Sequence, residues 1–474
     1  MTMTQIKFGT SGWRAILCDD FTFDNVRAVS RAIADYLNHE GIADQGVVIG
    51  YDARFMAKDF ARETVRVLAS AGIPSYLCER DTPTPVIAHE LLRRKAAGAI
   101  NFTASHNPHT YNGIKFSPAW GGPALPQTTT DIEARANALQ GSDIPVMDLD
   151  KAKADNLYTE IDPLPAYFDT LKQLIDFNAI AGSGLRIAVN PLYGSGRGYL
   201  DTILEQAGVP VTTINSHLDP YFGGEPPEPA EAHIADFIKL IKEDRQIGLG
   251  LATDGDADRF GIVDSDGTYI EPNYILALLF DYMIRRKGLT GDAARSVATS
   301  HLIDAVAAYH QVKVLETPVG FKFIGEYISA GKILIGGEES AGLTVRGHVP
   351  EKDGILACLL VAEMVAAEKK SLKELLADLY GRVGAFYTRR INIRLSAELE
   401  ANLPAKLENP PAEIEGRSIT EVIRIDGNKF LFADGSWILF RKSGTEPVVR
   451  LYAEASSEAI LEQLIAAGRN FILS

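Results

Sequence analysis

GVVIGYDARFMAKDFARETVRVLASAGIPSYL, residues 46–77, contains a complete strand–helix–strand pattern. Its first five residues, Gly46–Gly50, are mostly β-branched and bounded by glycine, which is typical of a short buried strand. A helical stretch continues to Ala71, Gly72 ends it, and Ile73–Leu77 forms a second apolar run. A strand, a helix and another strand in this order predict a βαβ unit with parallel strands.

The same pattern recurs twice farther along the chain. The strand, helix and strand that we expect in the second copy are Leu185–Asn190, Tyr199–Gln206 and Val209–Ile214. In the weaker third copy they are Ser296–Ser300, a helix that runs to His310, and Val312–Glu316. Three such copies predict an α/β fold with three related domains, each built on a mixed and mostly parallel sheet.

Each copy is followed by one more apolar run that ends in a polar loop. Gly98–Phe102 leads into Ser105, Ile247–Ala252 into Asp254, and Ile333–Gly336 into Glu338, as listed in the order of the three copies. Ligands of open α/β sheets bind outside the carboxyl ends of the strands. We therefore expect these three loops to face one another around a central cleft.

The last part of the chain has a different character. Gly384–Leu395 and Ser418–Phe432 alternate polar and apolar residues, and Ser457–Arg469 has a helical pattern, so we expect a smaller C-terminal α+β domain. The predicted domains are 1–150 with the serine-containing loop, 151–257 with the acidic loop, 258–378 with the Glu338 loop, and 379–474 with a basic, glycine-containing loop.

Composition narrows the class of protein and its partners. The 474 residues carry a net charge of -15, which disfavours nucleic acid and anionic membranes as partners and leaves small-molecule substrates. The 3 cysteines form no CxxC pair, and the first twenty residues are not those of a secretory signal, so we expect a cytoplasmic protein. The longest apolar stretch, Gly354–Ala367, is too short to span a bilayer and predicts a buried helix. We expect a monomer or a homodimer.

Asp254, Asp256 and Asp258 alternate with two small residues. Three ionised carboxylates this close together require a cation between them, and their oxygens suit octahedral Mg²⁺ that shares a phosphate. An EF-hand loop requires glycine at its sixth position and glutamate at its twelfth. It is excluded here because those positions are Arg259 and Ser265. A solvated acidic turn remains the alternative interpretation.

Ser105 precedes His106 in TASHNP and is a candidate for carrying a phosphoryl group. Alone, the pair is more typical of a helix cap, but the nearby NGIKF segment with Lys115 reverses the balance in favour of the catalytic interpretation. Lys115 could donate or accept a proton if its pKa were lowered, and the alternative is a surface lysine. Asp52 and Arg54, which follow the first strand, are interpreted as a structural ion pair.

Together these segments resemble one family. TASHNPHTYNGIKF, DGDADR, GGEESAG, TPVGFK and RKSGTEP, in this order, are similar to the motifs of the α-D-phosphohexomutases, which include phosphoglucomutase, phosphomannomutase and phosphoglucosamine mutase. The resemblance covers nearly the whole chain and implies four domains around a central cleft.

The resemblance also implies roles for individual residues. Ser105 would carry the phosphoryl group and share Mg²⁺ with Asp254, Asp256 and Asp258, while the catalytic residues around it would be His106, Lys115, Arg14 and Arg259. Glu338 and Ser340 would bind sugar hydroxyls. The remaining substrate-binding residues would be Lys322, His348 and Lys352, with Arg441, Ser443, Gly444 and Thr445 holding the phosphate that is not transferred.

The implied reaction is the interconversion of glucose 1-phosphate and glucose 6-phosphate, with glucose 1,6-bisphosphate as intermediate and activator. GEES, TPVGFK and EKDG are more similar to glucose-directed members, although the chain lacks the histidine that some members carry after the sugar-loop serine and glycine. The alternatives are a phosphomannomutase or bifunctional enzyme, then a phosphoglucosamine mutase, a sugar-phosphate phosphatase or a catalytically silent sensor.

Overall fold

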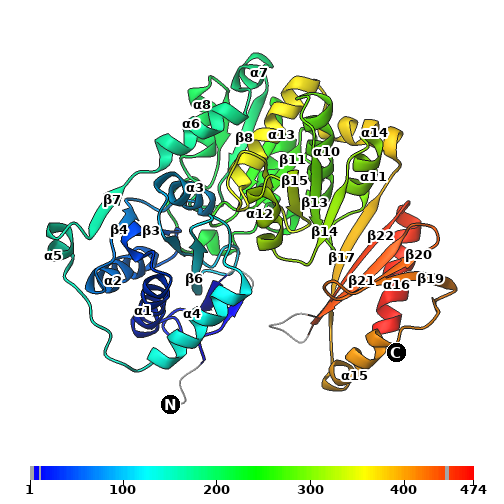
Figure 1. The fold of residues 1–474 in the computed structure, drawn as a ribbon. Coiled ribbons are helices and arrows are strands. Elements are labelled where there is room, and N and C mark those ends of the chain that lie inside the picture. Colours follow the sequence, from blue (N-terminus) through cyan, green and yellow to red (C-terminus); the bar gives the residue numbers. More distant parts are fainter. Residues whose placement is uncertain (1–4, 10–11, 443–447, 474) are drawn as a thin grey trace. The chain divides into compact units, whose positions relative to one another are not determined.

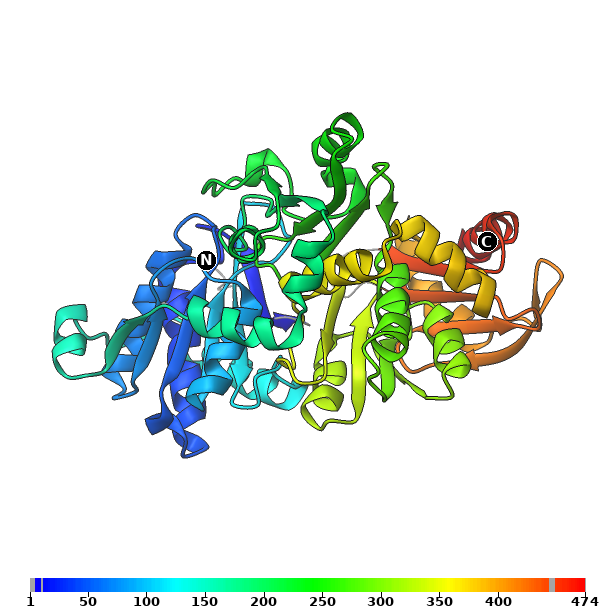
Figure 2. The same cartoon turned by 90° about the horizontal axis from the view of Figure 1, so that it is seen from above.

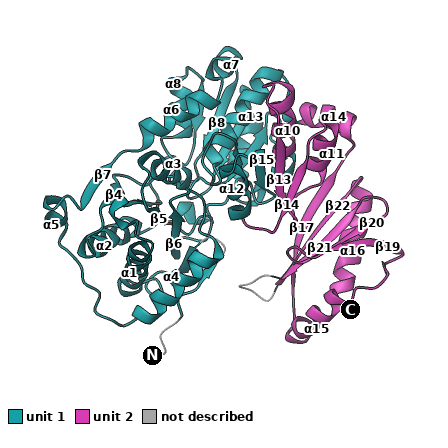
Figure 3. Cartoon of the chain, in the orientation of Figure 1, with its two compact units in different colours: residues 1–275, 321–372 teal, residues 276–320, 373–474 magenta. Residues whose placement is uncertain are grey.

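The computed structural model describes residues 5–9, 12–442 and 448–473 (Figure 1). The chain divides into two compact units, residues 1–275 with 321–372 and residues 276–320 with 373–474 (Figure 3). In the described part of the chain, no helix combines the length and the apolar composition needed to cross a membrane.

The first unit begins with a seven-stranded mixed sheet. Its strand order is β1 (Phe8–Gly9), β2 (Gly12–Ile16), β6 (Tyr111–Pro118), β5 (Gly98–Phe102), β3 (Val47–Tyr51), β4 (Ser75–Cys78) and β7 (Tyr158–Ile161). The strands β5, β3, β4 and β7 are parallel, and the β1, β2 and β6 side is antiparallel. The predicted βαβ unit at residues 46–77 is confirmed, because β3 and β4 pair in parallel and α2 (Ala57–Ser70) joins them.

Helices cover both faces of this sheet (Figure 2). Val47 and Ile49 point into the core beneath α2, while Val48 packs on the opposite face with Ile87 and Leu91. A strand buried on both sides explains why residues 47–49 are apolar without alternation. The other helices of this region are α1 (Phe23–His39), α3 (Thr84–Arg94), α4 (Pro126–Leu139) and α5 (Leu149–Ala154), with the 3₁₀ helix η1 (Ala43–Gln45).

A second sheet follows in the same unit. Its order is β12 (Tyr269–Ile270), β11 (Phe260–Asp264), β10 (Ile247–Thr253), β8 (Arg186–Asn190) and β9 (Val211–Thr213). β8, β9 and β10 are parallel, as predicted, whereas β10 and β11 form an antiparallel hairpin closed by the acidic loop, residues 254–259. The accompanying helices are α6 (Leu164–Leu174), α7 (Phe177–Gly182), α8 (Leu200–Gln206), η2 (Phe222–Gly224), η3 (Glu231–His233) and α9 (Ala235–Glu243).

Residues 321–372 complete the first unit. They form α12 (Phe321–Ser329), the antiparallel pair β15 (Ile333–Glu338) and β16 (Gly342–Val345), and α13 (Gly354–Glu368). The Asp353 side chain caps α13 by accepting a hydrogen bond from the Leu356 amide. Residues 354–366 are all buried, so the prediction of a buried helix over this apolar stretch is confirmed.

The second unit contains α10 (Pro272–Arg285), the parallel strands β13 (Asp292–Ser296) and β14 (Val314–Thr317), α11 (Leu302–Tyr309) and α14 (Leu372–Val383). The predicted strand Ser296–Ser300 is wrong, because β13 ends where that prediction begins. The misassignment arises from Arg295, a buried cation inside β13 that Asp304 and Glu316 neutralise at 2.5 and 2.7 Å. Charge pairing across the tertiary structure allows an arginine where a strand pattern demands an apolar residue.

The C-terminal part of this unit is an antiparallel sheet with two helices. The order is β17 (Tyr387–Arg394), β22 (Val448–Ala455), β21 (Trp437–Lys442), β20 (Asn428–Phe432), β19 (Arg417–Ile423) and β18 (Glu413–Ile414). Leu461 and Leu464 of α16 (Glu458–Leu473) enter the core beneath these strands. The prediction of an α+β region is confirmed, although α15 (Ala397–Glu408), which contains Pro404, was not predicted.

Candidate active site

Ser105 lies in the loop of residues 103–110 that joins β5 to β6, hereafter the serine loop. The residue is 1% exposed, and its backbone φ of +50° is in the left-handed region that non-glycine residues seldom adopt. The Ser105 amide donates to Thr103 Oγ1 at 2.8 Å, and Ser105 Oγ donates to Asp254 Oδ2 at 2.8 Å. The fold therefore joins the predicted phosphoryl carrier to the first aspartate of the acidic loop.

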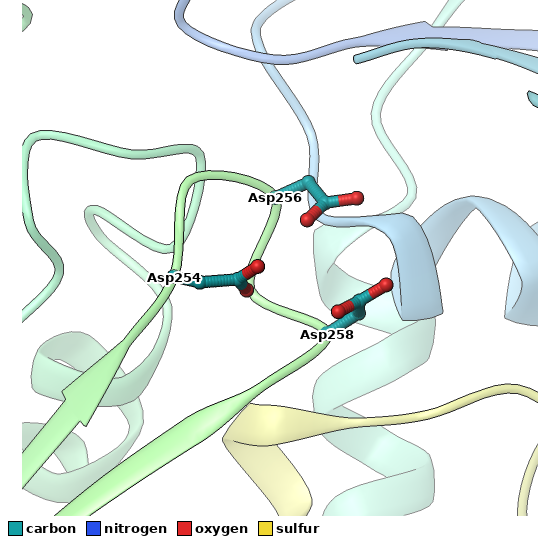
Figure 4. A group of neighbouring side chains, drawn as sticks. All are labelled: Asp254, Asp256 and Asp258. Atoms are coloured by element: carbon teal, nitrogen blue, oxygen red, sulfur yellow. The ribbon is translucent and has the colours of Figure 1, made fainter. Parts of the chain in front are cut away.

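The acidic loop holds its three aspartates by backbone hydrogen bonds. The Ala257 amide donates to the Asp254 carbonyl at 3.0 Å, and the Arg259 amide donates to Asp254 Oδ1 at 3.0 Å. Asp254, Asp256 and Asp258 are all 0% exposed, and each offers a carboxylate oxygen within 4.8 Å of the others (Figure 4). The alternative of a solvated acidic turn is wrong, because no part of these side chains faces water.

Two lysines enter the same space. Lys115 of β6 places Nζ 2.6 Å from Asp256 Oδ2 and 3.0 Å from Asp258 Oδ2, and Lys352 places Nζ 2.7 Å from Asp258 Oδ2. We call these five residues, Asp254, Asp256, Asp258, Lys115 and Lys352, the acidic cluster. Lys115 is 9% exposed, so the alternative of an ordinary surface lysine is excluded.

Burial and charge divide the cluster into groups of different protonation. Burial raises the pKa of Asp254 well above its ordinary value, and the Asp256 and Asp258 carboxylates raise it further. Burial also acts to raise the pKa of Asp256, but the charge and hydrogen bond of Lys115 outweigh it and hold that pKa below its ordinary value. The two lysines thus favour the ionised forms of Asp256 and Asp258, whereas the mutual repulsion of the three carboxylates is strongest at Asp254.

The same balance sets the state of Lys115. Burial acts to lower the pKa of this lysine, yet Asp256 and Asp258 raise it above its ordinary value. The sequence allowed Lys115 to donate or accept a proton if its pKa were lowered. With its pKa raised instead, Lys115 is protonated at neutral pH and can act as a donor.

The donor set fits a divalent cation. Asp256 Oδ1 and Asp258 Oδ1 are buried and have no hydrogen-bond partner, which costs free energy unless a ligand satisfies them. Hard carboxylate oxygens gathered in this way are the ligands that Mg²⁺ prefers. The residues present therefore match the cation predicted from the sequence, and Lys115 and Lys352 supply the opposing charge in this arrangement.

Three predicted catalytic residues surround Ser105 and the acidic loop. His106 Nδ1 lies 3.4 Å from Ser105 Oγ, and burial, followed by the charges of Arg259 and Arg14, lowers the pKa of His106 well below its ordinary value. Arg14 of β2 donates from Nη1 to Asn107 Oδ1 at 2.8 Å. Arg259 lies 3.4 Å from Glu228 and 3.9 Å from Asp258, and its buried Nε has no hydrogen-bond partner.

The turn between β15 and β16 carries Glu338, Glu339 and Ser340. A backbone hydrogen bond connects this turn to the residue that follows the acidic loop, because the Phe260 amide donates to the Ala341 carbonyl at 3.3 Å. Glu338 is 6% exposed at the end of β15. A Cβ on Gly342, the residue opposite Glu338, would lie 2.3 Å from Lys352 Cδ, so this glycine makes room for the lysine of the acidic cluster. The structure thus brings the predicted Glu338 loop to the Asp254 loop.

The remaining predicted site residues have partners of their own or fall outside the described residues. The His348 ring is buried, with Nε2 2.6 Å from Asp353 Oδ2, the oxygen that also accepts a hydrogen bond from Tyr167. Lys322 lies in the first turn of α12, and burial lowers its pKa. Arg441 belongs to the second unit, where its Nε donates to Asp426 at 2.9 Å. Ser443, Gly444 and Thr445 lie outside the described residues, so their role stays a prediction.

Sequence reasoning missed two residues of this site. Thr84 at the start of α3 donates from Oγ1 to Asp256 Oδ2 at 2.6 Å, and nothing in its TPTP context distinguishes it from a helix start. Burial raises the pKa of Glu351 to about 7, against the opposing charges of Lys352 and Lys115. Its position beside Lys352 in the EKDG segment was the signal available in the sequence.

Comparison with known proteins shows the family to which this chain belongs. Sequence models of the three α/β/α domains of the phosphoglucomutase/phosphomannomutase family match residues 5–142, 165–267 and 271–383, and the model of its C-terminal domain matches 391–470. The chain belongs to the α-D-phosphohexomutase family. It is therefore an intramolecular phosphotransferase, an isomerase of the phosphohexomutase type.

Individual relatives resemble the whole chain. A phosphoglucomutase of Komagataeibacter xylinus is 31% identical, over 96% of this chain and 88% of the relative. A phosphoglucomutase/phosphomannomutase of Thermococcus kodakarensis is 30% identical over 97% of both chains. The crystal structure of a putative phosphomannomutase from Thermus thermophilus has 32% identity and a TM-score of 0.87, with all of both chains covered. These phosphohexomutase relatives carry names for more than one sugar specificity.

Proposed function

We propose that this phosphohexomutase interconverts glucose 1-phosphate and glucose 6-phosphate through a phosphorylated Ser105 and a bisphosphorylated sugar. The observation that carries the proposal is the 2.8 Å hydrogen bond from the buried Ser105 Oγ to Asp254, at the edge of a cluster of three carboxylates and two lysines. A carrier shielded from bulk water suits transfer to a sugar hydroxyl rather than hydrolysis.

The reaction consists of two phosphoryl transfers. In the first, the free hydroxyl oxygen of the sugar bonds to phosphorus as the bond between phosphorus and Ser105 Oγ breaks, and a bisphosphorylated sugar results. After the sugar reorients, Ser105 Oγ bonds to the phosphorus at the other position, and the oxygen left on the sugar becomes a hydroxyl. Catalysis of such transfers depends mainly on positioning and on electrostatic stabilisation.

Each transfer also moves a proton from the attacking hydroxyl to the leaving oxygen. Lys115, which Asp256 and Asp258 keep protonated, suits the donor role. His106, whose pKa burial and nearby cations lower, is neutral near pH 7 and suits the acceptor role. The 3.4 Å between His106 Nδ1 and Ser105 Oγ supports this assignment for the second transfer, in which Ser105 Oγ is the attacking atom that gives up its proton.

Asp254, Asp256 and Asp258 would hold Mg²⁺ together with an oxygen of phosphoserine 105. A bound Mg²⁺ acts as a Lewis acid on the transferring phosphoryl group and offsets charge that this group adds to the cluster. A phosphoserine brings about -1.5 to -2 charges, too many to lie beside three aspartates without further cations. The chain's own cations, Lys115, Lys352 and Arg259, surround the same carboxylates.

Glu338 and Ser340 would bind the sugar hydroxyls in both orientations of the intermediate. Glucose is the proposed sugar because GEES, TPVGFK and EKDG are more similar to glucose-directed family members. Mannose 1-phosphate is the second candidate substrate, since the Thermococcus relative is named for both activities and the Thermus structure for mannose. The two sugars differ in the orientation of one hydroxyl, so a single hydrogen-bonding side chain can separate them.

Two measurements test the proposal. Isotopically labelled glucose 1,6-bisphosphate should transfer one phosphoryl group to Ser105, detected by mass spectrometry of the peptide that contains it. The ratio kcat/KM should be highest for glucose 1-phosphate when it is compared with mannose 1-phosphate and glucosamine 1-phosphate. Release of free phosphate in step with turnover would indicate a phosphatase, and an unlabelled Ser105 would refute the phosphoserine route.

A further inference from the structure

Arg54 lies three residues after the end of β3, and its side chain is 0% exposed. Its Nε donates to Asp52 Oδ2 at 3.0 Å, which agrees with the ion pair expected from the sequence. The ion pair accounts for one of the five N–H donors of the guanidinium, and a buried arginine needs partners for the other four.

The four remaining donors all reach backbone carbonyls at the start of β6 and in the serine loop. Nη1 and Nη2 each donate to two of them, at Pro108 (2.7 Å), Tyr111 (3.0 Å), Ser105 (2.6 Å) and Asn107 (2.6 Å). One side chain thus satisfies four backbone acceptors within seven residues, and its planar geometry determines where each carbonyl can lie.

This contact explains how the serine loop keeps an unusual conformation. Ser105 has a φ of +50°, which is unfavourable for a residue with a side chain and persists only where its surroundings enforce it. The Ser105 carbonyl is held by Arg54, and a Cβ added to Gly255 of the acidic loop would lie 2.8 Å from that same oxygen. The Phe222 ring covers the guanidinium at 5.1 Å. The carbonyl of Ser105 is therefore fixed from two sides, which leaves its Oγ directed at Asp254.

We infer that Arg54 is a positioning residue for phosphoryl transfer. It holds the backbone of the serine loop so that Ser105 Oγ meets the acidic loop, and it does not itself touch the reacting atoms. The inference rests on the proposed role of Ser105 as phosphoryl carrier. Because Arg54 contributes geometry, its loss should reduce kcat far more than it changes KM.

Arg54→Lys is the informative substitution. A lysine keeps the charge but has three donors on one atom, so it cannot hold four carbonyls and Asp52 in a fork. Arg295→Lys in β13 is the matched control, because Arg295 is also buried, 3% exposed, and paired with carboxylates but has no contact with the serine loop. Both variants should have a lower melting temperature, whereas only Arg54→Lys should have a lower kcat.

Steady-state kinetics with glucose 1-phosphate and glucose 1,6-bisphosphate give the readout, together with the melting temperature of each variant. For Arg54→Lys we expect kcat to fall about 100-fold with KM changed by less than about three-fold. Phosphorylation of Ser105 by labelled bisphosphate should slow by a similar factor. Arg295→Lys should keep kcat within about three-fold of wild type. Equal kcat values for Arg54→Lys and wild type, or equal losses in the two variants, would overturn the inference.

Two further outcomes keep the test decisive. If wild-type Ser105 takes up no phosphoryl group, the proposed function fails whatever Arg54 does. If Arg54→Lys does not fold, Asp52→Asn replaces it, because this change weakens the hold on Nε and leaves the guanidinium in place. We then expect kcat about ten-fold lower and faster amide exchange in the serine loop. An unchanged kcat and unchanged exchange in Asp52→Asn would refute the positioning role.

Discussion

The acidic cluster of the first unit and a second buried group of charges in the other unit differ in how completely their atoms are paired. The second group centres on Lys429, which is 0% exposed in β20. Its Nζ donates to the Val297 carbonyl at 2.9 Å, lies 2.7 Å from His301 Nε2, and lies 4.1 Å from the centre of the Trp437 ring. We call this group, with Glu316, Arg295 and Glu454, the Lys429 cluster.

The carboxylates of the Lys429 cluster are also paired. Glu454 accepts hydrogen bonds from Trp437 Nε1 at 2.8 Å and from the His301 amide at 3.1 Å. Glu316 lies 2.7 Å from Arg295 and 3.5 Å from Lys429. Burial, followed by the charge of Arg295, lowers the pKa of Lys429 to about 8, which is what a buried cation in an apolar sheet should experience.

The acidic cluster, by contrast, contains buried polar atoms that have no hydrogen-bond partner. Among the residues that the structure describes, the buried side-chain atoms without a hydrogen-bond partner include Asp256 Oδ1, Asp258 Oδ1 and Arg259 Nε, and none belongs to the Lys429 cluster. Burial of charge is common to both groups, so burial by itself does not mark a functional site. A functional site is indicated when like charges converge and some of their buried atoms have no hydrogen-bond partner. Such an arrangement is unfavourable until a ligand binds and pairs with those atoms.

Among the substitutions that distinguish the two clusters, replacement of Ser105 should reduce mutase turnover the most. Ser105→Ala removes the proposed phosphoryl carrier, so mutase turnover should fall at least about 1,000-fold, measured by a coupled assay for glucose 6-phosphate. Ser30→Ala is the control, because Ser30 is also buried and hydrogen-bonded, 2.7 Å from Thr64 Oγ1, but lies in α1. Near-normal turnover in Ser105→Ala would show that the acidic cluster does not mark the site of phosphoryl transfer.

Disruption of the Lys429 cluster should change stability and leave the chemistry intact. Lys429→Met leaves the buried Glu454 without the positive charge that acts on it, which should lower the free energy of unfolding by about 3–5 kcal/mol. Urea denaturation measures this loss, and the exposed Lys313→Met serves as the control for loss of one positive charge. The kcat of the folded variant should match wild type. A large fall in kcat without a loss of stability would show that the paired cluster has a catalytic role.

Asp256→Asn tests whether the acidic cluster binds Mg²⁺. The amide keeps the shape but loses the charge that Mg²⁺ prefers, so the Mg²⁺ concentration needed for half-maximal activity should rise about 10- to 100-fold. Glu454→Gln removes a buried carboxylate of the Lys429 cluster and should leave the Mg²⁺ dependence unchanged. Similar Mg²⁺ titrations of Asp256→Asn and wild type would contradict the proposed ligands.

The smallest expected effect is a pH dependence of stability that originates at Glu351. Its pKa of about 7 in the folded state exceeds the value of about 4.5 in the unfolded chain, so the folded state binds more protons between these values. The stability contribution is full below pH 4.5 and is lost as the pH rises through 7. Relative to Glu351→Gln, the wild type should lose about 2 kcal/mol between about pH 5.5 and 7.5.

Denaturation curves of wild type and Glu351→Gln at several pH values measure this difference. The exposed Glu326→Gln in α12 provides the control for removal of an ordinary surface carboxylate. Parallel pH profiles for wild type and Glu351→Gln would mean that Glu351 stays ionised in the folded protein, with the two lysines as sufficient counter-charge.

Part of this architecture could be predicted because it depends on local patterns. Val47–Ile49 and Ile247–Leu251 are apolar over successive residues, which indicates strands buried on both faces wherever they occur. Arg295 lies inside β13 and Pro404 inside α15, so each interrupts the local pattern by which its strand or helix could be predicted. Arg54 was correctly paired with Asp52, yet its contacts with the serine loop span more than fifty residues and have no local signature.

The amino-acid sequence alone determined the order of strands and helices and the kinds of chemical group available, since hydrophobic period and residue type are properties of short segments. Only the tertiary structure decided which of those groups meet and in which state of protonation. Ser105 and Asp254 are 149 residues apart in the chain but hydrogen-bonded in space. Lys115 stays protonated because two carboxylates from another loop outweigh its burial. Electrostatic energy depends on distance and on exclusion of water, and both quantities exist only after the chain has folded.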